Sequence, residues 1–276
     1  MISADRIGVA LWSIGIGATE AEFAKVLDDA LKTGVKGVQP WCVDEPAWKT
    51  VCWLDPDRCS TSALRSKARK MIESRGLKIS GLCSQLAGPT HLGGIGEAHA
   101  DMEADVVKTE RSLELAADLG VQVVTTHPGP IPADAADPVY ALMLKNLGRI
   151  AKTAERTRTQ FCIETGQESA ETLRGFLEKI GSPGLKVNFD PANMVRWGTV
   201  PAVKTLAKYI VHTHAKDINE KTGKATLGTG AVPWPAYLKA LDEVGYTGWF
   251  AIEDESKNEK LASISTGREF LLNAKY

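Results

Sequence analysis

The chain has 276 residues, of which 43% are hydrophobic, and its formal net charge at pH 7 is -1. A chain of this length can bury a large core, and the near balance of charge gives no reason to expect a nucleic-acid or membrane surface. No apolar segment approaches the ~20 residues of a membrane span, and no signal-peptide pattern opens the sequence, so we expect a cytoplasmic protein. The five cysteines form no C-x-x-C pair, which predicts reduced, buried thiols.

Short apolar runs alternate with longer segments of helical period along the whole chain. Eight runs are predicted as strands, within residues 6–13, 34–41, 77–83, 121–127, 160–164, 185–190, 209–217 and 248–254. Amphipathic segments at 20–34, 106–120, 140–155 and 234–248 are predicted as helices, several closing on a glycine. Eight strand–helix units predict a closed (β/α)8 TIM barrel, and no linker divides the chain, so we predict one domain over residues 1–276.

Two segments, residues 42–62 and 84–98, are longer than the usual loop between a strand and its helix. Long loops at the carboxyl ends of barrel strands commonly supply lids and substrate contacts. The first contains Trp48 and Trp53, whose flat faces suit sugar rings but also serve as ordinary hydrophobic cover.

The run IVHTHAKD carries His212, His214 and Lys216 at alternate positions. Side chains alternate between the two faces of a strand, so these three share one face. The outer face of a barrel packs against helices and is apolar. We therefore expect the three polar side chains to point into the barrel, with His212 one layer deeper than His214.

Four consecutive predicted strands end in potential metal ligands, and three of these ligands are carboxylates: Glu164, Asp190 and Glu253. Buried carboxylates are rare unless they are paired or bound to metal, because removing a charge from water costs several kcal/mol. Together with His214 they form a predicted site for one divalent cation. Three oxygen ligands and one imidazole favour Mn²⁺, with Mg²⁺, Co²⁺ or Zn²⁺ as alternatives, and the lack of thiolates argues against structural zinc.

The segments FCIETGQES, VNFDPANMVRWG, IVHTHAKD and LGTGAVPWPAYLKALDEVGYTGWFAIEDE resemble the xylose isomerase-like TIM-barrel family of sugar phosphate isomerases and epimerases. The resemblance is strongest over residues 120–275. It implies the same metal ligands: Glu164, Asp190, His214 and Glu253. The expected substrate contacts are Asn193, Lys216, His127, Glu168 and Trp12.

The sequence departs from the family at several positions. Asn193 stands where tagatose-type epimerases have a histidine, and an amide orients a substrate oxygen without exchanging protons. Gln39 stands where many members have glutamate. Thr229 replaces a frequent acidic residue, and we interpret the flanking Gly228 and Gly230 as loop geometry, with anion binding by their amides as the alternative.

A site of this kind suits proton transfer beside a carbonyl, through an enediolate held on the cation. Glu164 and Glu253 are the predicted catalytic carboxylates. We expect a metal-dependent isomerase or epimerase of a small carbohydrate. The alternative is a metal-dependent dehydratase or lyase acting on a keto-sugar, keto-glycoside or inosose.

Two other classes fit the sequence less well. An endonuclease IV-like nuclease needs three metals and a histidine-rich site, whereas this chain has five histidines in all. A sugar-binding barrel without catalysis gives no reason to bury three carboxylates together. We therefore expect no nucleic-acid or membrane partner, and a homo-oligomer stays open.

Overall fold

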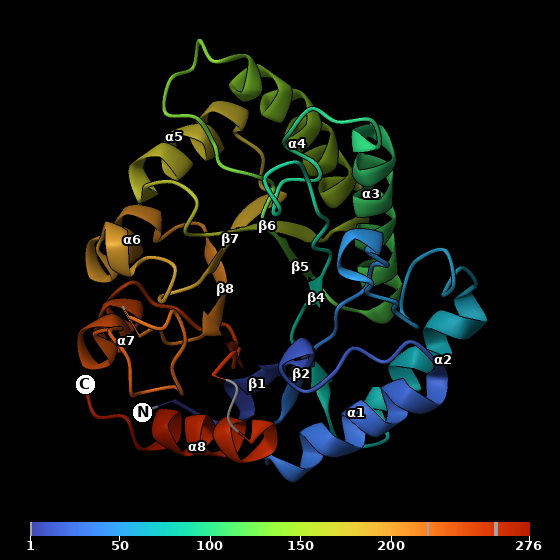
Figure 1. The fold of residues 1–276 in the computed structure, drawn as a ribbon, viewed down its shortest axis with the longest axis vertical. Coiled ribbons are helices and arrows are strands. Elements are labelled where there is room, and N and C mark those ends of the chain that lie inside the picture. The colour runs from blue at the N-terminus through green and yellow to red at the C-terminus, as the bar shows by residue number, and fades with distance from the viewer. Residues whose placement is uncertain (1, 220, 257–258) are drawn as a thin grey trace.

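The computed structural model describes residues 2–219, 221–256 and 259–276. In that part of the chain, nine parallel strands form one sheet in the order β3-β2-β1-β9-β8-β7-β6-β5-β4. They are β1 (Ile7–Ala10), β2 (Gly37–Gln39), β3 (Lys78–Ile79), β4 (Leu82–Cys83), β5 (Val123–Thr126), β6 (Gln160–Glu164), β7 (Leu185–Phe189), β8 (Ile210–Ala215) and β9 (Phe250–Ile252). Because β1 pairs with β9, the sheet curls into the predicted barrel (Figure 1).

The strand predicted over residues 77–83 is split into two pieces, which is why nine strands stand where eight were expected. Its first piece, β3, pairs with β2, and its second piece, β4, pairs with β5. Gly81 lies between the pieces, and a Cβ there would come within 3.0 Å of the Val123 side chain. This one segment therefore contacts both neighbouring strands in turn and completes the ring.

Helices surround the barrel, as Figure 1 shows. The α-helices in the described residues are α1 (Glu20–Lys32), α2 (Ser62–Glu73), α3 (Met102–Leu119), α4 (Pro138–Thr157), α5 (Ala170–Ile180), α6 (Thr199–Leu206), α7 (Trp234–Glu243) and α8 (Lys260–Asn273). Thr19 and Glu22 form a capping box that starts α1, and Gly120 ends α3 with a positive φ of 75°. The four helices predicted from the sequence are confirmed. None of the described helices is both long and apolar enough to cross a membrane.

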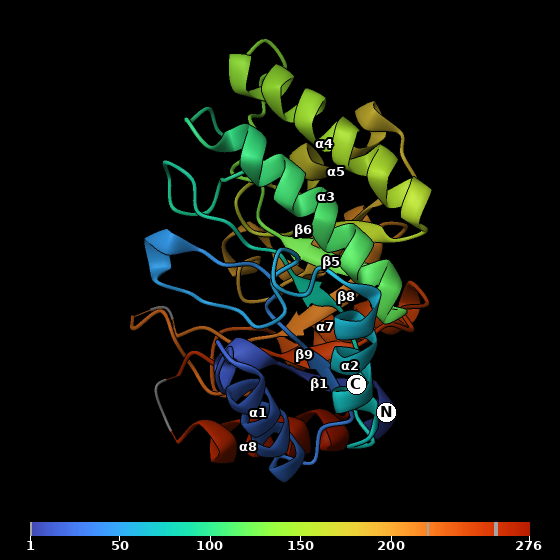
Figure 2. The ribbon, with the colours of Figure 1, turned by 90° about the vertical axis from the view of Figure 1, so that its right-hand side faces the viewer.

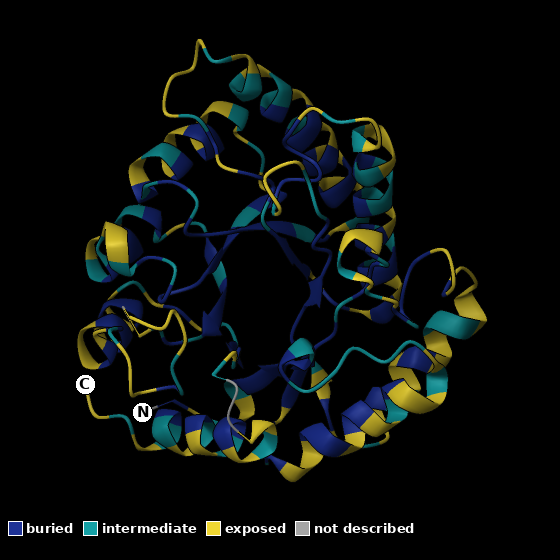
Figure 3. Ribbon diagram, viewed as in Figure 1, coloured by how far each residue is buried: buried dark blue, intermediate teal, exposed yellow. Residues whose placement is uncertain are grey.

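The two faces of the strands differ as predicted, although both are buried (Figure 3). On the outer face, Phe189 stacks on Tyr237 of α7, and the Tyr237 hydroxyl donates a hydrogen bond to Thr213 Oγ1 at 3.0 Å. His212 and His214 lie on the opposite face of β8, inside the barrel. The core between strands and helices is therefore apolar, and the barrel interior is polar.

The carboxyl ends of the strands carry the long loops. Figure 2 shows the segments that follow β2 and β8 projecting from one end of the barrel, whereas both termini lie at the other end. The expectation about the cysteines is confirmed, since all five are buried and free.

Candidate active site

The four predicted metal ligands converge at the carboxyl end of the barrel. Glu164 ends β6, Asp190 follows β7, His214 lies on β8 and Glu253 follows β9. One potential ligand atom from each lies within 4.8 Å of the others, and all four residues are buried. Parallel strands bring their carboxyl ends to one rim, so residues far apart in sequence meet there.

Gln39 fixes the orientation of the His214 ring. The Gln39 Oε1 atom lies 3.0 Å from His214 Nε2 and can accept a hydrogen bond from it, which makes Nδ1 the ring atom that would bind a metal. His214 Nδ1 lies 3.0 Å from Glu253 Oε2, 3.3 Å from Glu164 Oε1 and 3.8 Å from Asp190 Oδ2. The Nδ1 atom of His214 therefore faces all three carboxylates.

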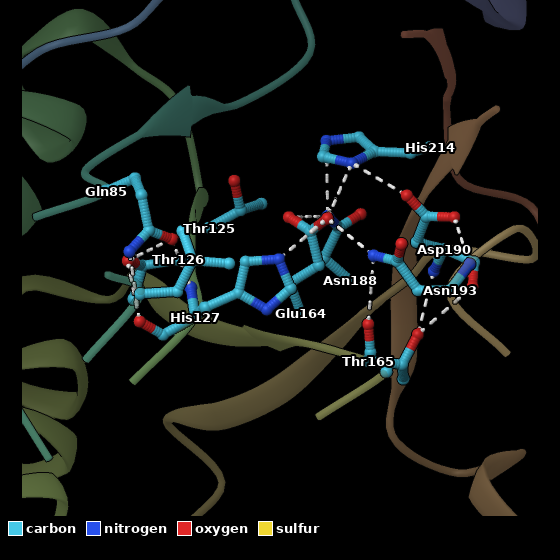
Figure 4. A network of polar contacts seen from close by, with 12 residues as sticks. Gln85, Thr125, Thr126, His127, Glu164, Thr165, Asn188, Asp190, Asn193 and His214 are labelled. Carbon is cyan, nitrogen blue, oxygen red and sulfur yellow. Dashed lines mark hydrogen bonds and ion pairs between the residues drawn. The ribbon is translucent and has the colours of Figure 1, made fainter. Parts of the chain in front are cut away.

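Three side chains hold Glu164 (Figure 4). His127 Nε2 lies 3.2 Å from Glu164 Oε1, and Asn193 Nδ2 donates to the same oxygen at 3.4 Å. Asn188 Nδ2 donates to Glu164 Oε2 at 3.2 Å. Both oxygens of this carboxylate are thus positioned by neighbours from β5, β7 and the segment after β7.

Glu253 is held from the opposite side of the barrel. Trp12 Nε1, just after β1, donates to Glu253 Oε1 at 2.9 Å. Lys216 Nζ lies 3.4 Å from the same oxygen. The second oxygen of Glu253 stays directed at His214 Nδ1.

The residues fit a divalent cation. Asp190 Oδ1 accepts hydrogen bonds from the backbone N–H groups of Ala192 and Asn193, at 2.8 and 3.1 Å. Asp190 Oδ2 and Glu253 Oε2 are buried and accept no hydrogen bond from the described residues. Two buried, unsatisfied carboxylate oxygens beside an imidazole nitrogen are the donor set of a metal site.

The pKa shifts in the cluster also indicate that its carboxylates are stabilised by nearby positive charge. Burial acts to raise the pKa of Glu164, yet the charges of His214 and His127 hold that pKa well below its usual value. Burial alone would lower the pKa of His214, but Glu164 and Glu253 raise it well above its usual value. Burial also raises the pKa of Asp190. The protein alone compensates its carboxylates with the charges of His214, His127 and Lys216.

A cavity of about 250 Å³ opens above Glu164 and Glu253. Its lining residues are Trp12, Trp41, Trp48, Cys83, Gln85, His91, Leu92, His127, Glu164, Lys216, Glu253 and Glu255. The Trp12 and Trp41 rings meet edge to face with centroids 5.7 Å apart, and Trp41 and Trp48 do so at 5.8 Å. Trp53, the other tryptophan singled out from the sequence, instead packs on Phe23 of α1 with centroids 5.5 Å apart.

The predicted substrate contacts fall into two groups. His127, Lys216 and Trp12 line the cavity. Asn193 and Glu168 are not among its lining residues. Asn193 contacts Glu164, and buried Glu168 accepts a hydrogen bond from the Ile131 N–H at 3.1 Å. Substrate binding by all five residues remains a prediction.

Sequence analysis missed Asn188 as a member of the site. Asn188 is fully buried on β7, and its Oδ1 accepts a hydrogen bond from His212 Nδ1 at 2.8 Å. Burial lowers the pKa of His212 to about 3, so this ring is neutral. His212 reaches Glu164 only through Asn188, in the deeper layer that was predicted. The alternation that placed Asp190 inside the barrel also places Asn188 there, and this signal could have identified it.

The glycine-containing loop after β8 is organised by Asp217. The Asp217 carboxylate accepts hydrogen bonds from the backbone N–H groups of Gly228, Gly230 and Val232, at 2.9, 2.9 and 3.1 Å. It also accepts one from Trp234 Nε1 at 2.9 Å. The interpretation of Gly228 and Gly230 as loop geometry is confirmed, because their amides already bind a carboxylate of the chain itself.

Three proteins match part of the sequence, and two of them illustrate the range. An uncharacterized protein of Methanocaldococcus jannaschii is 26% identical over 187 residues, which are 61% of this chain and 68% of that protein. D-psicose 3-epimerase of Ruminiclostridium cellulolyticum is 26% identical over 123 residues, which are 40% of this chain and 39% of the epimerase.

Solved structures share the fold over nearly the whole chain. A xylose isomerase domain protein from Planctomyces limnophilus superposes with a TM-score of 0.76 at 24% identity, covering 96% of this chain and 94% of that one. An L-ribulose 3-epimerase superposes with a TM-score of 0.75 at 18% identity, covering 96% of this chain and 93% of the epimerase. The probable 3-DHS dehydratase AsbF of Bacillus anthracis superposes with a TM-score of 0.74 at 15% identity, covering 98% of this chain and 100% of the dehydratase.

A family model described as xylose isomerase-like TIM barrel matches residues 27–274. The matched range contains all four residues of the buried carboxylate and histidine cluster. The chain therefore belongs to the xylose isomerase-like TIM-barrel family.

Proposed function

We propose that this chain is a divalent-metal-dependent epimerase or isomerase of a small keto-sugar or keto-sugar derivative, with Mn²⁺ as the favoured cation. The observation that carries the proposal is the pair of carboxylates, Glu164 and Glu253, which belong to one buried cluster and line the same cavity. The similarity to D-psicose 3-epimerase supports a sugar substrate.

The cation would be held by Glu164, Asp190, His214 and Glu253. When bound, it supplies positive charge that stabilises negative charge developing on substrate oxygens. The remaining contributions come from the chain itself.

Removing a proton from the carbon beside a carbonyl requires a base that is ionised and correctly placed. His127 and Asn188 hold Glu164, and Trp12 and Lys216 hold Glu253, so neither carboxylate can rotate freely. We propose that one glutamate removes the proton and the other returns it to the opposite face, which epimerises the carbon. Return to the neighbouring carbon instead gives isomerisation.

The tryptophans contribute by excluding water and covering one face of the substrate. Trp12, Trp41 and Trp48 line the cavity, whose volume of about 250 Å³ is on the scale of a monosaccharide. Apolar C–H faces of sugars pack well on aromatic rings. The polar groups Gln85, His127 and Lys216 line the cavity as well and would orient the hydroxyl groups.

A second candidate is a dehydratase, which Lys216 favours. Burial acts to lower the pKa of Lys216, but Glu253 and Asp190 raise it above its usual value, so its ammonium stays charged. A charged ammonium that lines the cavity can donate a hydrogen bond to a departing hydroxyl and stabilise the negative charge that develops on it during elimination.

Incubation of the Mn²⁺-loaded chain with ketoses and keto-glycosides in heavy water tests both candidates. Deuterium at a carbon beside the carbonyl, with the mass otherwise conserved, supports epimerisation or isomerisation. Loss of water from the product supports elimination. If every substrate in the panel is recovered unlabelled from enzyme shown to contain the cation, the proposal is wrong.

A further inference from the structure

The charge at the mouth of the cavity determines which sugars can enter. We propose that the site selects unphosphorylated sugars and that Glu255 is the residue that excludes phosphorylated ones. This inference rests on the proposed function, because it specifies the substrate class of the same site.

Lys216 is the one lysine or arginine among the described residues that line the cavity, and it is already paired. Its Nζ lies 3.4 Å from Glu253 Oε1 on one side and 3.4 Å from Glu255 Oε2 on the other. A phosphate group needs Arg, Lys or free backbone amides. Here it would compete with two carboxylates for a single ammonium.

The histidines of the cavity also have partners. His91 Nδ1 accepts a hydrogen bond from Trp48 Nε1 at 3.1 Å, and His127 Nε2 contacts Glu164. Trp48 and Glu164 each occupy one nitrogen of these rings, and His127 Nδ1, buried and without a hydrogen-bond partner among the described residues, offers a single donor.

The backbone anion-binding alternative considered from the sequence, at Gly228 and Gly230, is filled as well. Gly228 and Gly230 both direct their N–H groups at Asp217 Oδ2 at 2.9 Å, and Val232 donates to Asp217 Oδ1. This loop could have formed an anion-binding nest, but the chain supplies its own carboxylate as the anion. No amide of these three residues is left for a substrate phosphate.

The balance of formal charge points the same way. Glu164, Glu253 and Glu255 line the cavity, and Asp190 lies in the ligand cluster beneath it. These four carboxylates match the four positive charges of a divalent cation, Lys216 and the His127 ring. A phosphate ester, which carries close to two negative charges at neutral pH, therefore finds no excess of positive charge to pair with.

A neutral sugar, by contrast, matches the unsatisfied groups. The Trp41 Nε1 atom is buried and donates no hydrogen bond to any described residue. Trp41 lines the cavity, so a hydroxyl or ring oxygen of a neutral sugar can accept from it. Glu255 would have the opposite effect on a phosphate, because it occupies the ammonium and repels the dianion.

Calorimetric titration of the Mn²⁺-loaded chain with matched pairs of compounds tests the proposal. The probes are D-fructose against D-fructose 6-phosphate and L-ribulose against L-ribulose 5-phosphate. We expect each phosphate to bind the wild-type chain at least tenfold more weakly than its parent sugar. In Glu255→Gln, which leaves Lys216 paired with Glu253 alone and removes one negative charge, the ratio of the two dissociation constants should move at least tenfold toward the phosphate.

Glu243→Gln is the matched control. Glu243, on α7, lies 3.6 Å from Lys204 and is exposed to a similar extent as Glu255, but it does not line the cavity. This control makes the same change in net charge and should leave the ratio unchanged.

Three results would overturn the proposal. One is tighter binding of a phosphate than of its parent sugar by the wild-type chain, a measurement that needs no variant. The second is the same ratio of the two dissociation constants in Glu255→Gln as in wild type. Failure of both proteins to bind either compound counts as this second result. The third is an equal change in Glu243→Gln. If the chain incorporates deuterium into phosphorylated ketoses, the selectivity is refuted but the proposed function is supported. If the chain binds unphosphorylated sugars selectively but labels none of them, the selectivity is supported and the proposed function is refuted.

Discussion

Asp190→Asn should have opposite effects on stability in the presence and absence of the cation. The substitution removes one negative charge from the cluster but keeps the Oδ1 atom that accepts hydrogen bonds from the N–H groups of Ala192 and Asn193. The backbone turn after β7 therefore stays intact. What changes is the unpartnered Oδ2 atom, which faces His214 Nδ1 at 3.8 Å.

The magnitude follows from the separation of the ligand atoms. Two unit charges at the 4.8 Å limit of this cluster repel by about 3 kcal/mol at an effective dielectric constant of 20. The charge on His214 offsets part of this repulsion. We therefore expect the metal-free variant to be about 1 to 2 kcal/mol more stable than metal-free wild type, which corresponds to roughly 2–8 °C in Tm.

The cation should reverse the order. At a free Mn²⁺ concentration about 1,000 times Kd, the wild-type chain gains about 4 kcal/mol of unfolding free energy. The variant lacks one anionic ligand and should gain little. Thermal and urea unfolding of both proteins at pH 8, with excess chelator or with Mn²⁺, measures the two differences.

Asp28→Asn is the control, because Asp28 is an exposed carboxylate on α1, paired with Arg75. It should respond to Mn²⁺ as wild type does. The reasoning is refuted if Asp190→Asn gains as much stability from Mn²⁺ as wild type, or if it destabilises the metal-free protein.

Three further predictions concern residues around the cluster. Burial raises the pKa of Glu168 to about 7, above its value in the unfolded chain. The stabilisation by the neutral carboxyl is therefore full below the unfolded pKa and is lost as pH rises through 7. Between pH 5 and pH 8, the free energy of unfolding measured in urea should fall by roughly 2 kcal/mol more in wild type than in Glu168→Gln. Parallel pH dependences of the two proteins would contradict this. Trp12→Phe keeps the ring but removes the donor to Glu253, so kcat should fall about tenfold with the cation still bound, as steady-state assays and metal analysis can show. Asn193→Ala should retain the cation and change mainly KM, and loss of the cation would make Asn193 part of the metal site instead.

The strand pattern predicted the barrel and the ligand set because both depend on alternation and on strand ends. Each predicted strand contains an observed one, and Glu164, Asp190 and His214 lie where two-residue periodicity places them. The break at Gly81 was not predicted, because it depends on how closely the chain passes Val123 of β5.

The surroundings of the ligands were harder to predict. Gln39 contacts His214 across 175 positions of sequence, and no local pattern encodes that distance. The two tryptophans of the long loop look alike in sequence, yet Trp48 faces the cavity and Trp53 packs on Phe23. Which of them reaches the site depends on the path of an irregular loop.

The placement of the ligands also imposes an order on how the site is assembled during synthesis. All four ligand residues lie between positions 164 and 253, in strands β6 to β9 or directly after them. The growing chain therefore has no complete ligand set until residue 253 has left the ribosome. Glu253 then receives a hydrogen bond from Trp12, near the start of the chain, and β9 pairs with β1. Capture of a cation by this cluster would thus be coupled to the pairing of β9 with β1, and unfinished chains would gain no protection from it.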